Sequence, residues 1–404
     1  MIYLDNCATT KMRKEVLDNI YRSMEENFAN PSSLHELGLK SEKAIKSSRE
    51  TIASYMGVDG KEIYFTSGGT ESNNIAIQSI AKSLKKRGNH IITSKIEHSS
   101  VKNIMKDLER QGFKVTYLDV DSKGMVDLDS LKESINDGTI LVSIIYVNNE
   151  IGTIQNIKEI KRTIEQKNID TLLHVDAVQA FGKIDFQVKS LGIDTLSISS
   201  HKIHGPKGTG ALYVNKDLNL DPIVFGGKQE RGLRSGTENV SGIIAFGKAV
   251  ELMAENKQEE REKVYKIKQY TMDKIKEEIK DIKINSQLGG NFSPYILNIS
   301  IRDTRGEVLL HYLEQDEIYI STSSACSSHD TKKSDVLKSI GLNDNEIEGT
   351  IRICFSYDTS YDDIDKFVKS LKRSVEEIRK IILRWYIGKG NKYKFRWIGI
   401  KRWK

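Results

Sequence analysis

The chain has 404 residues, more than a single hydrophobic core usually supports, so two domains are expected. Its hydrophobic fraction of 38%, charged fraction of 29% and 4 prolines fit a soluble globular protein and argue against long disordered linkers. The formal net charge is +6, but Arg384–Lys404 alone holds eight Lys and Arg residues and no acidic ones, which leaves −2 on the rest. The positive charge therefore belongs to a C-terminal tail and does not indicate that the body of the protein binds nucleic acid.

The three cysteines, Cys7, Cys326 and Cys354, show no paired Cys-x-x-Cys spacing. This argues against a disulfide framework and against a zinc site, and it indicates a reducing compartment, with the cytoplasm as the expected location. The N-terminal segment Met1–Asp5 lacks the basic and then apolar order of a secretory signal. The longest apolar run, Thr139–Val147, has the length of a buried strand and not of a membrane span.

From about Glu62 to Val214, short β-rich runs alternate with longer segments that are apolar at helical spacing, such as Ile157–Gln166. The runs expected to form strands are Glu62–Ser67, His90–Ser94, Lys114–Val120, Ile140–Val147, Leu172–Asp176 and Thr195–Ser199. This alternation predicts βαβ units, and hence an α/β fold with a mostly parallel sheet that helices cover on both faces.

The second half of the chain has a different pattern. After Gly236, a helical stretch rich in Lys and Glu runs to about Lys280 and is expected to connect two domains. A smaller α+β unit follows, with elements expected at Ile296–Ile301, Glu307–Gln315, Ile318–Ser323, Ile351–Ser356 and Ile364–Leu383. We therefore expect a large domain at 13–255, a small domain built from 1–12 and 256–383, and a basic aromatic tail at 384–404.

Polar clusters follow several of the expected strands. They are Ser67–Thr70, Glu97-His98, Asn148–Glu150, Asp176 and Ser199–Lys202. Ligands of parallel sheets bind beyond the carboxyl ends of the strands, so these clusters are expected to form one site.

Lys202 lies just past an expected strand, in the segment Ser199–Gly208, whose Gly and Pro residues favour a tight turn. Lysine forms Schiff bases with aldehydes when its surroundings lower its pKa, and the neighbouring Ser and His side chains can hold a phosphate. An ordinary surface turn is the alternative for this segment taken alone.

Asp176 ends an apolar run, and a buried aspartate needs a cationic partner, such as the protonated pyridine nitrogen of pyridoxal phosphate (PLP). A helix N-cap is the alternative for Asp176 alone, but Lys202, 26 residues downstream, favours the cofactor. In the loop Ser67–Asn73, two glycines, backbone N–H groups and the Thr70 hydroxyl can bind a phosphate. His98 can stack on a pyridine ring, although a single histidine is more often structural.

Together with further segments in the same order, these motifs resemble a known family. The segments are Asp5–Thr10, Asn30–Ser33, Thr66–Asn74, Glu97-His98, Val147–Gly152, His174–Gln179, Ser199–Gly208, Arg231–Thr237 and Ser324–Cys326. Over about residues 2 to 380 the chain closely resembles the cysteine desulfurases, which are fold-type I, class V aminotransferase-like PLP enzymes. The most specific part is Ser-x-His-Lys combined with a downstream Ser-Ala-Cys. The resemblance implies the type I PLP-dependent transferase fold.

The resemblance also implies the residues that bind PLP. Lys202 would form the Schiff base and later move protons, while His98 would stack over the ring and take part in catalysis. Asp176 would pair with the pyridine nitrogen, and Gln179 would contact the ring hydroxyl. The residues expected to hold the phosphate are Gly69, Thr70, Ser199 and His201.

Two further implications concern the neighbouring subunit and the substrate. Thr237 would reach the phosphate bound to the other subunit, which implies a homodimer. Asn149 and Arg352 would hold the substrate carboxylate, with Asn30 nearby, because the planar fork of Arg matches a carboxylate.

Cys326 lies in a stretch of mostly small, polar residues, Thr322–Asp330. By itself this stretch also fits an unreactive surface thiol. The resemblance implies that the Cys326 thiolate takes the sulfur of L-cysteine as a persulfide, so that L-cysteine becomes L-alanine. The persulfide sulfur would then pass to an iron–sulfur scaffold or a tRNA thiolation enzyme. Selenocysteine lyase, cysteine sulfinate desulfinase, and a non-catalytic sulfur carrier or scaffold are the alternatives. Cys7 and Cys354 have apolar or strand-like neighbours and are expected to be structural.

Some segments depart from the family pattern. Asn6-Cys7 and Ile353-Cys354 are less usual variants, and the residues after Cys326 differ in composition from those of the relatives. The tail 384–404 lies outside the resemblance and holds all three tryptophans among its basic residues. Aromatic side chains among cations suit RNA or an anionic membrane surface, and docking onto the protein's own acidic surface or simple disorder is the alternative.

Overall fold

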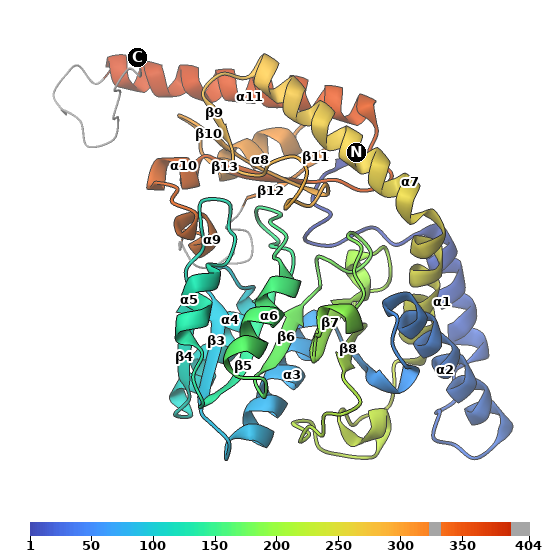
Figure 1. The fold of residues 1–404 in the computed structure, drawn as a ribbon. Helices are drawn as coiled ribbons and strands as arrows, with labels where there is room; N and C mark the ends of the chain where they lie inside the picture. Colours follow the sequence, from blue (N-terminus) through green and yellow to red (C-terminus); the bar gives the residue numbers. More distant parts are fainter. Residues whose placement is uncertain (323–332, 389–404) are drawn as a thin grey trace.

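The computed structural model describes the backbone of residues 1–322 and 333–388, and the side chains of residues 1–322 and 333–381. In these residues, a seven-stranded sheet lies below a four-stranded sheet in the view of Figure 1, and one long helix runs beside both. The two sheets meet at the edge where the large sheet carries its polar strand ends.

The large sheet has the strand order β2-β8-β7-β6-β5-β3-β4. Its strands are β2 (Ile63–Thr66), β3 (His90–Ser94), β4 (Lys114–Leu118), β5 (Thr139–Ile145), β6 (Leu172–Asp176), β7 (Thr195–Ser199) and β8 (Gly210–Val214). Only β8 runs against the others, so the sheet is mostly parallel. Every residue of β5 is buried, as a central strand covered on both faces requires.

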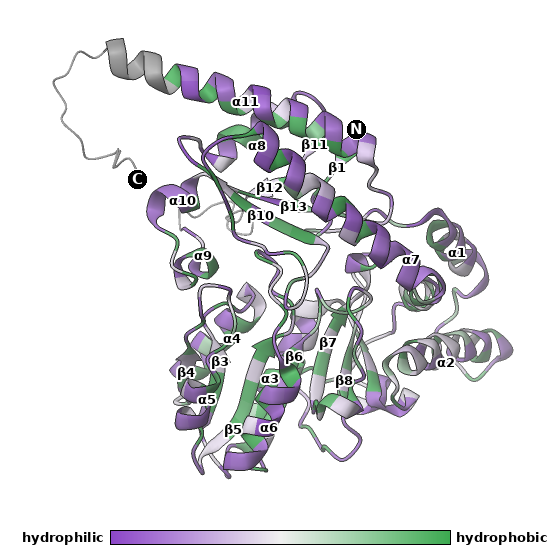
Figure 2. Cartoon of the chain, turned by 45° about the horizontal axis from the view of Figure 1, so that its top comes forward, coloured by the Kyte–Doolittle hydropathy of each residue, from purple (hydrophilic) through white to green (hydrophobic). Residues whose placement is uncertain are grey.

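Helices lie on both faces of this sheet. They are α3 (Gly69–Leu84), α4 (Ser99–Arg110), α5 (Leu128–Ser134) and α6 (Ile157–Lys167). Adjacent residues of β3 show the two faces: Ile91 belongs to an apolar cluster with α3 and α4, whereas Ile92 belongs to another with Ile160 of α6. Figure 2 shows the hydrophobic strands inside this layer of more hydrophilic helices.

The small sheet is antiparallel, with the order β12-β13-β10-β9. Its strands are β9 (Ile282–Ile284), β10 (Ile296–Ile301), β12 (Ser321–Thr322) and β13 (Thr350–Cys354). A separate parallel pair joins β1 (Ile2–Tyr3) to β11 (Ile318–Tyr319). The segment expected to be one strand from Ile318 is thus divided at Ile320 between two sheets. The helices of this part are α8 (Gly306–Glu314), α9 (Asp335–Ser339), α10 (Asp344–Glu348) and α11 (Tyr361–Gly388).

Helix α7 (Val240–Glu278) joins the two parts and has 39 residues, a length of about 58 Å. Asn239 begins it by accepting a hydrogen bond from the Gly242 N–H at 3.2 Å. Helices α1 (Lys14–Glu26), α2 (Glu36–Met56) and α11 all pack against it. Helix α11 continues five residues beyond Leu383, where the sequence pattern was expected to end it.

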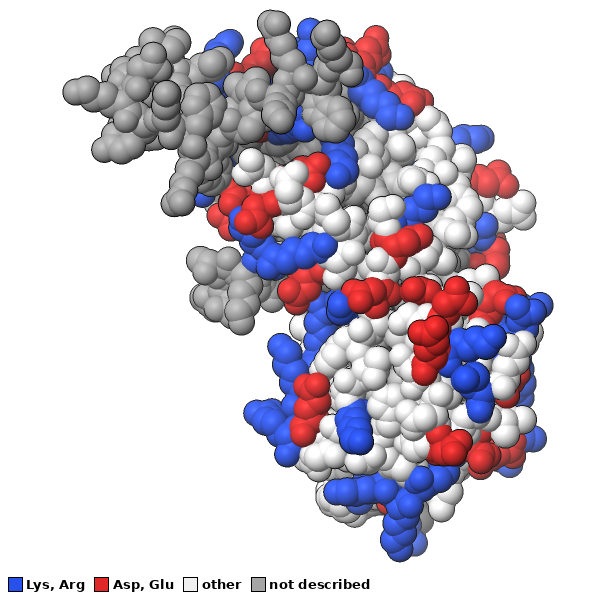
Figure 3. All heavy atoms as spheres, turned by 60° about the vertical axis from the view of Figure 1, so that its left-hand side comes forward, with Lys and Arg blue, Asp and Glu red and all other residues white. Residues whose placement is uncertain are grey.

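On the face shown in Figure 3, Lys and Arg side chains are interspersed with Asp and Glu among the residues that the structure describes. Each helix in the described ranges is too short or too polar to cross a membrane.

Candidate active site

The candidate site lies at the carboxyl edge of the large sheet. Strand β2 pairs antiparallel with β8, which pairs antiparallel with β7, so β2 runs in the same direction as the five parallel strands. The polar segments that follow β2, β3, β5, β6 and β7 therefore emerge on one side of the sheet, as the sequence pattern predicted.

Asp176 ends β6 and is 3% exposed. Its Oδ1 accepts a hydrogen bond from the Val178 N–H at 3.0 Å, and its Oδ2 accepts one from Asn73 Nδ2 at 2.8 Å. Residues after Asp176 form a turn and not a helix, so the N-cap alternative does not describe this carboxylate. Both donors are neutral, which leaves the buried charge suited to a cationic partner.

Asn73 and His174 are site residues whose roles the sequence did not reveal. His174 Nε2 lies 3.0 Å from Asn73 Oδ1, and its Nδ1 lies 2.8 Å from Thr195 Oγ1. Since Asn73 Nδ2 faces the carboxylate of Asp176, its Oδ1 must accept, so His174 carries its proton on Nε2. Burial lowers the pKa of His174 to about 3, which keeps the ring neutral. A chain of hydrogen bonds thus fixes the orientation of the Asp176 carboxylate.

His98 is tied to the same network. It precedes α4 and accepts a hydrogen bond from the Ser100 N–H on Nδ1, so it also serves as the helix N-cap. Ser100 Oγ lies 2.9 Å from His98 Nδ1 and accepts from Asn73 Nδ2. Burial lowers the pKa of His98, while the nearby charge of Asp176 raises it.

Glu97, next to His98, is buried, and one of its two carboxylate oxygens accepts hydrogen bonds from the described residues. Its Oε1 accepts from Ser94 Oγ at 2.5 Å and from the Ile145 N–H at 2.9 Å, while its Oε2 has no hydrogen-bond partner among the described residues. Burial raises the pKa of Glu97 to about 8, and the charge of Asp176 adds to this effect. Burial therefore favours the protonated, uncharged form of Glu97.

The loop between β2 and α3 has the geometry of an anion site. Gly68 has φ 151° and ψ −178°, a conformation open essentially to glycine alone, and it precedes Gly69 and the exposed Thr70 at the start of a 16-residue helix. A Cβ on Gly68 would lie 3.7 Å from Ser199 Oγ. This hydroxyl is buried and has no hydrogen-bond partner in the described chain. A phosphate would satisfy both the hydroxyl and the N–H groups that begin α3.

Lys202 follows β7 in the short turn Ser200–Lys202. Its Nζ donates to the carbonyl oxygens of Cys7 and Ala8, at 2.5 and 2.7 Å. Gln179 Nε2 also donates to the Cys7 carbonyl, at 2.9 Å, so Lys202 and Gln179 meet on one carbonyl of the N-terminal segment. His201 Nδ1 lies 3.1 Å from Thr9 Oγ1. Burial and the charge of Lys202 lower the pKa of His201 to about 4.

Arg352, on β13 of the small sheet, reaches the segment after β5. Its Nη1 donates to the Asn149 carbonyl at 2.9 Å, and its Nη2 pairs with Asp5 Oδ1 at 3.0 Å. The Arg352 side chain is 5% exposed, and its Nε has no hydrogen-bond partner among the described residues. The guanidinium is thus held where the two sheets meet, with one donor unused.

Three expected site residues are not joined to this group by the described contacts. Asn30 is exposed, and its Oδ1 accepts from the Ser32 N–H at 2.9 Å. Thr237 is exposed before α7. Cys326 lies outside the residues that the structure describes.

Comparison with known proteins agrees with this geometry. The family model of class-V aminotransferases matches residues 2–367. The cysteine desulfurase IscS of Clostridium botulinum is 42% identical over 385 residues, which cover 95% of this chain and 96% of that protein.

Two solved structures extend the likeness to three dimensions. A NifS-like protein has a TM-score of 0.88 and 37% identity over 93% of this chain and 99% of its own. A structure described as SspA in complex with cysteine has a TM-score of 0.77 and 36% identity, over 88% of this chain and 99% of its own. The chain therefore belongs to the class-V aminotransferase family and, within it, to the cysteine desulfurases.

Proposed function

We propose that this cysteine desulfurase binds PLP at the carboxyl edge of the large sheet and moves the sulfur of L-cysteine onto Cys326. Cysteine desulfurases in general act on cysteine, depend on PLP and pass sulfur to acceptor proteins. One observation carries the assignment of the site: the buried Asp176 carboxylate, fixed by Asn73, lies at the same sheet edge as Lys202 and the glycine turn before α3.

The residues at this edge fit the cofactor. Bound PLP would supply an aldehyde for Lys202 and a ring that draws electrons from the substrate. Asp176 would hold the pyridine nitrogen, Gln179 the ring hydroxyl, and His98 the ring face. The residues proposed to hold the phosphate are Gly69, Thr70, Ser199 and His201. The buried Ser199 hydroxyl without a partner supports this proposal, because such a group needs a hydrogen bond.

The substrate carboxylate is proposed to bind to Arg352 and Asn149, with Asn30 contributing. The burial of the Arg352 guanidinium beside Asn149 supports this role, because its planar fork matches a carboxylate. The unused Nε of Arg352 provides a further donor.

Two groups of the chain then move atoms. Lys202 takes the proton from the substrate Cα and returns it later in the cycle. The Cys326 thiolate attacks the substrate sulfur, the bond between that sulfur and Cβ breaks, and its electron pair stays with the carbon fragment. The products are L-alanine and a persulfide on Cys326, so the substrate and the thiol together account for every atom.

Further parts of the proposal concern assembly and organisation. We propose a homodimer in which Thr237 reaches the phosphate of the neighbouring subunit, and an iron–sulfur scaffold or a tRNA thiolation enzyme as the sulfur acceptor. The division into 13–255, 1–12 with 256–383, and the tail 384–404 is part of it, as is a cytoplasmic location. Contact of the tail with RNA or an anionic surface is proposed from its interleaved aromatic and basic residues.

Mass spectrometry of the protein after exposure to L-cysteine tests the proposal. We expect one additional sulfur atom on the peptide that contains Cys326, together with one alanine per sulfur transferred. Cys326→Ser should keep the yellow absorbance of the cofactor and lose alanine production, whereas Lys202→Ala should lose covalent attachment of the cofactor. Full alanine production by Cys326→Ser would exclude the proposed role of the thiol.

A further inference from the structure

Two cysteines other than Cys326 meet beside the candidate active site. Cys7 lies in the N-terminal segment and Cys354 ends β13, and both side chains are almost fully buried, at 2% and 0% exposure. The Cys354 N–H donates to the Leu4 carbonyl at 2.7 Å, and Asn6 Nδ2 donates to the Cys354 carbonyl at 2.9 Å. These bonds hold the two segments in register, although 347 residues separate the cysteines in sequence.

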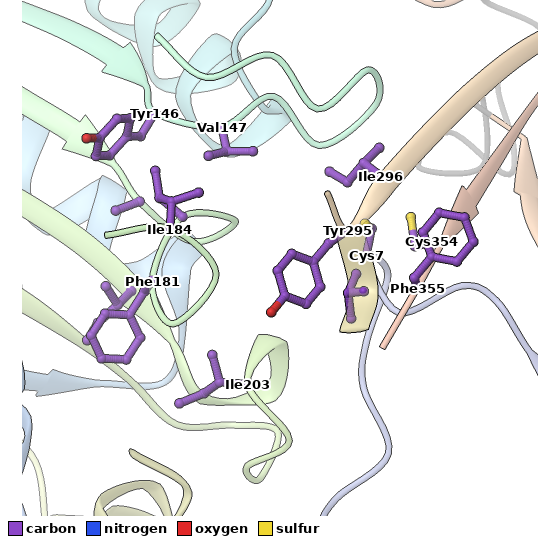
Figure 4. Close-up of a cluster of buried hydrophobic side chains, with 14 of the residues drawn as sticks. Cys7, Tyr146, Val147, Phe181, Ile184, Ile203, Tyr295, Ile296, Cys354 and Phe355 are labelled. Carbon is purple, nitrogen blue, oxygen red and sulfur yellow. The ribbon is translucent and has the colours of Figure 1, made fainter. Parts of the chain in front are cut away.

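The two thiols contact one another. Asp5 forms the β-bridge to Cys354, and Cys7 lies in the turn that follows, which the Ala8 N–H closes by donating to the Asp5 carbonyl at 3.0 Å. Both are free thiols, and each is close enough to shift the pKa of the other. Figure 4 shows the two sulfur atoms next to each other, beside Tyr295 and Phe355.

Cationic groups surround this pair. Burial alone would raise the pKa of the Cys7 thiol, but the neighbouring Cys354 thiol and the charges of Lys183, Arg352 and Lys202 lower it. Burial and the neighbouring Cys7 raise the pKa of Cys354. These surroundings therefore favour the thiolate on Cys7 over the thiolate on Cys354.

Both cysteines also belong to segments that hold the active-site residues. The Cys7 carbonyl accepts from Lys202 and Gln179. Arg352 precedes Cys354 by two residues on β13 and pairs with Asp5. Buried Lys183 donates to Gln179 Oε1 at 2.8 Å and so helps to orient the Gln179 side chain.

We propose that Cys7 and Cys354 form a redox-active dithiol, a modification site at which a hydroperoxide closes a disulfide within the folded protein. The contact between the two side chains, their fixed backbone register and the surrounding cations carry this inference. It is separate from the persulfide chemistry of Cys326 and requires no cofactor.

The chemistry balances as a two-electron oxidation. The Cys7 sulfur attacks one peroxide oxygen, the O–O bond breaks, hydroxide leaves, and a sulfenic acid forms on Cys7. The Cys354 sulfur then attacks the Cys7 sulfur, the S–O bond breaks, and a second hydroxide leaves as the S–S bond forms. The two thiol protons convert the hydroxides to water. Hydrogen peroxide is thus reduced to two waters, and the two thiols are oxidised to one disulfide.

The test uses the full chain with Cys326→Ser, so that Cys7 and Cys354 are its only cysteines. The folded variant is treated with hydrogen peroxide, its remaining thiols are alkylated in urea, and it is digested without reductant for mass spectrometry. We expect the Cys7 and Cys354 peptides to be linked within one chain, with a loss of two hydrogen atoms that dithiothreitol restores.

Two comparisons make the result specific. In a variant that also carries Cys354→Ser, the link should be absent and the sulfenic acid on Cys7 should react with dimedone. In a sample unfolded in urea before oxidation, the share of linked peptide should fall, because the fold no longer holds the sulfurs together.

Three results would overturn the proposal. The first is that Cys7 and Cys354 are both still alkylated after a peroxide treatment strong enough to oxidise added glutathione completely. The second is that either cysteine is over-oxidised without forming a link to the other. The third is that the only disulfide links found join two different chains. Because the bond itself is measured without L-cysteine, none of these results depends on the proposed function.

Discussion

Asn73 joins three other side chains of the candidate site by hydrogen bonds. It donates to Asp176 and to Ser100 and accepts from His174, so a single amide orients a carboxylate, a hydroxyl and a ring. Its side chain is fully buried, so water cannot replace these bonds if the amide is removed.

Asn73→Ala is expected to lower the free energy of unfolding by about 2–4 kcal/mol, because it leaves the His174 Nε2–H and Asp176 Oδ2 without the partner that Asn73 provides. Urea unfolding measures this loss. Asn74→Ala is the matched control, because Asn74 is the next residue on α3 and is partly exposed. Equal losses in the two variants would contradict the central place of Asn73.

Glu97 gives the site a predictable dependence on pH. Its pKa rises from an ordinary 4.5 to about 8 in the folded protein, mainly because of burial. Between these values the folded state keeps a proton that the unfolded state releases, so the contribution of Glu97 to stability is present below pH 4.5 and is lost as the pH rises towards 8.

Glu97→Gln should remove this dependence, because Gln has the shape of the protonated acid. Relative to the unaltered protein, the variant should gain stability between pH 5 and pH 8, by at most about 1.4 kcal/mol per pH unit. Urea unfolding at both pH values measures the difference. Glu133→Gln, at an exposed position on α5, is the control, and a similar gain there would show that Glu97 is not its source.

At the level of elements, the start of α3 depends on the close approach of β8. A Cβ on Gly210, the first residue of β8, would lie 2.6 Å from Gly68 Cα and 2.7 Å from the Ile198 carbonyl oxygen. Both neighbours are backbone atoms that cannot turn away. The glycine at position 210 therefore lets the loop between β2 and α3 lie directly against the sheet.

Gly210→Ala is expected to cost about 1–3 kcal/mol of stability, because overpacking against backbone forces the loop or the strand to move. Since the moved loop carries Gly68 and Gly69, the affinity for PLP should fall as well. Thermal unfolding and PLP titration measure the two effects. Gly138→Ala is the control, because its nearest neighbour is a side-chain atom, Asn136 Oδ1, at 3.3 Å, and a larger loss there would contradict the packing argument.

The sequence pattern predicted the elements well where apolar residues dominate. Four expected strands, β3, β6, β7 and β10, have the expected bounds, and the long helix after Gly236 is α7. Strand β8 was not expected, since its five residues directly follow a glycine-rich turn without an intervening helix. Short strands such as β9 and β1 were missed as well, because pairing with distant segments and not local composition defines them.

In the whole molecule, the candidate site shows the same contrast between features that local sequence predicts and features that depend on distant contacts. The sequence predicted that Asp176, Lys202, His98 and the glycine turn lie at one sheet edge, because parallel strands end on the same side. It could not reveal that Asn73 and His174 form a chain of hydrogen bonds or that Cys7 touches Cys354. These contacts join residues that are 101 and 347 positions apart, and neither separation leaves a local signal.

The pairing of the first residues with β11 and β13 has a consequence for folding during synthesis. Ile2 and Leu4 bond to strands that leave the ribosome more than 300 residues later. At usual rates of synthesis, the ribosome needs roughly 15–70 s to make the intervening chain. A nascent molecule can therefore complete its large sheet while its first ten residues still lack their partner strands.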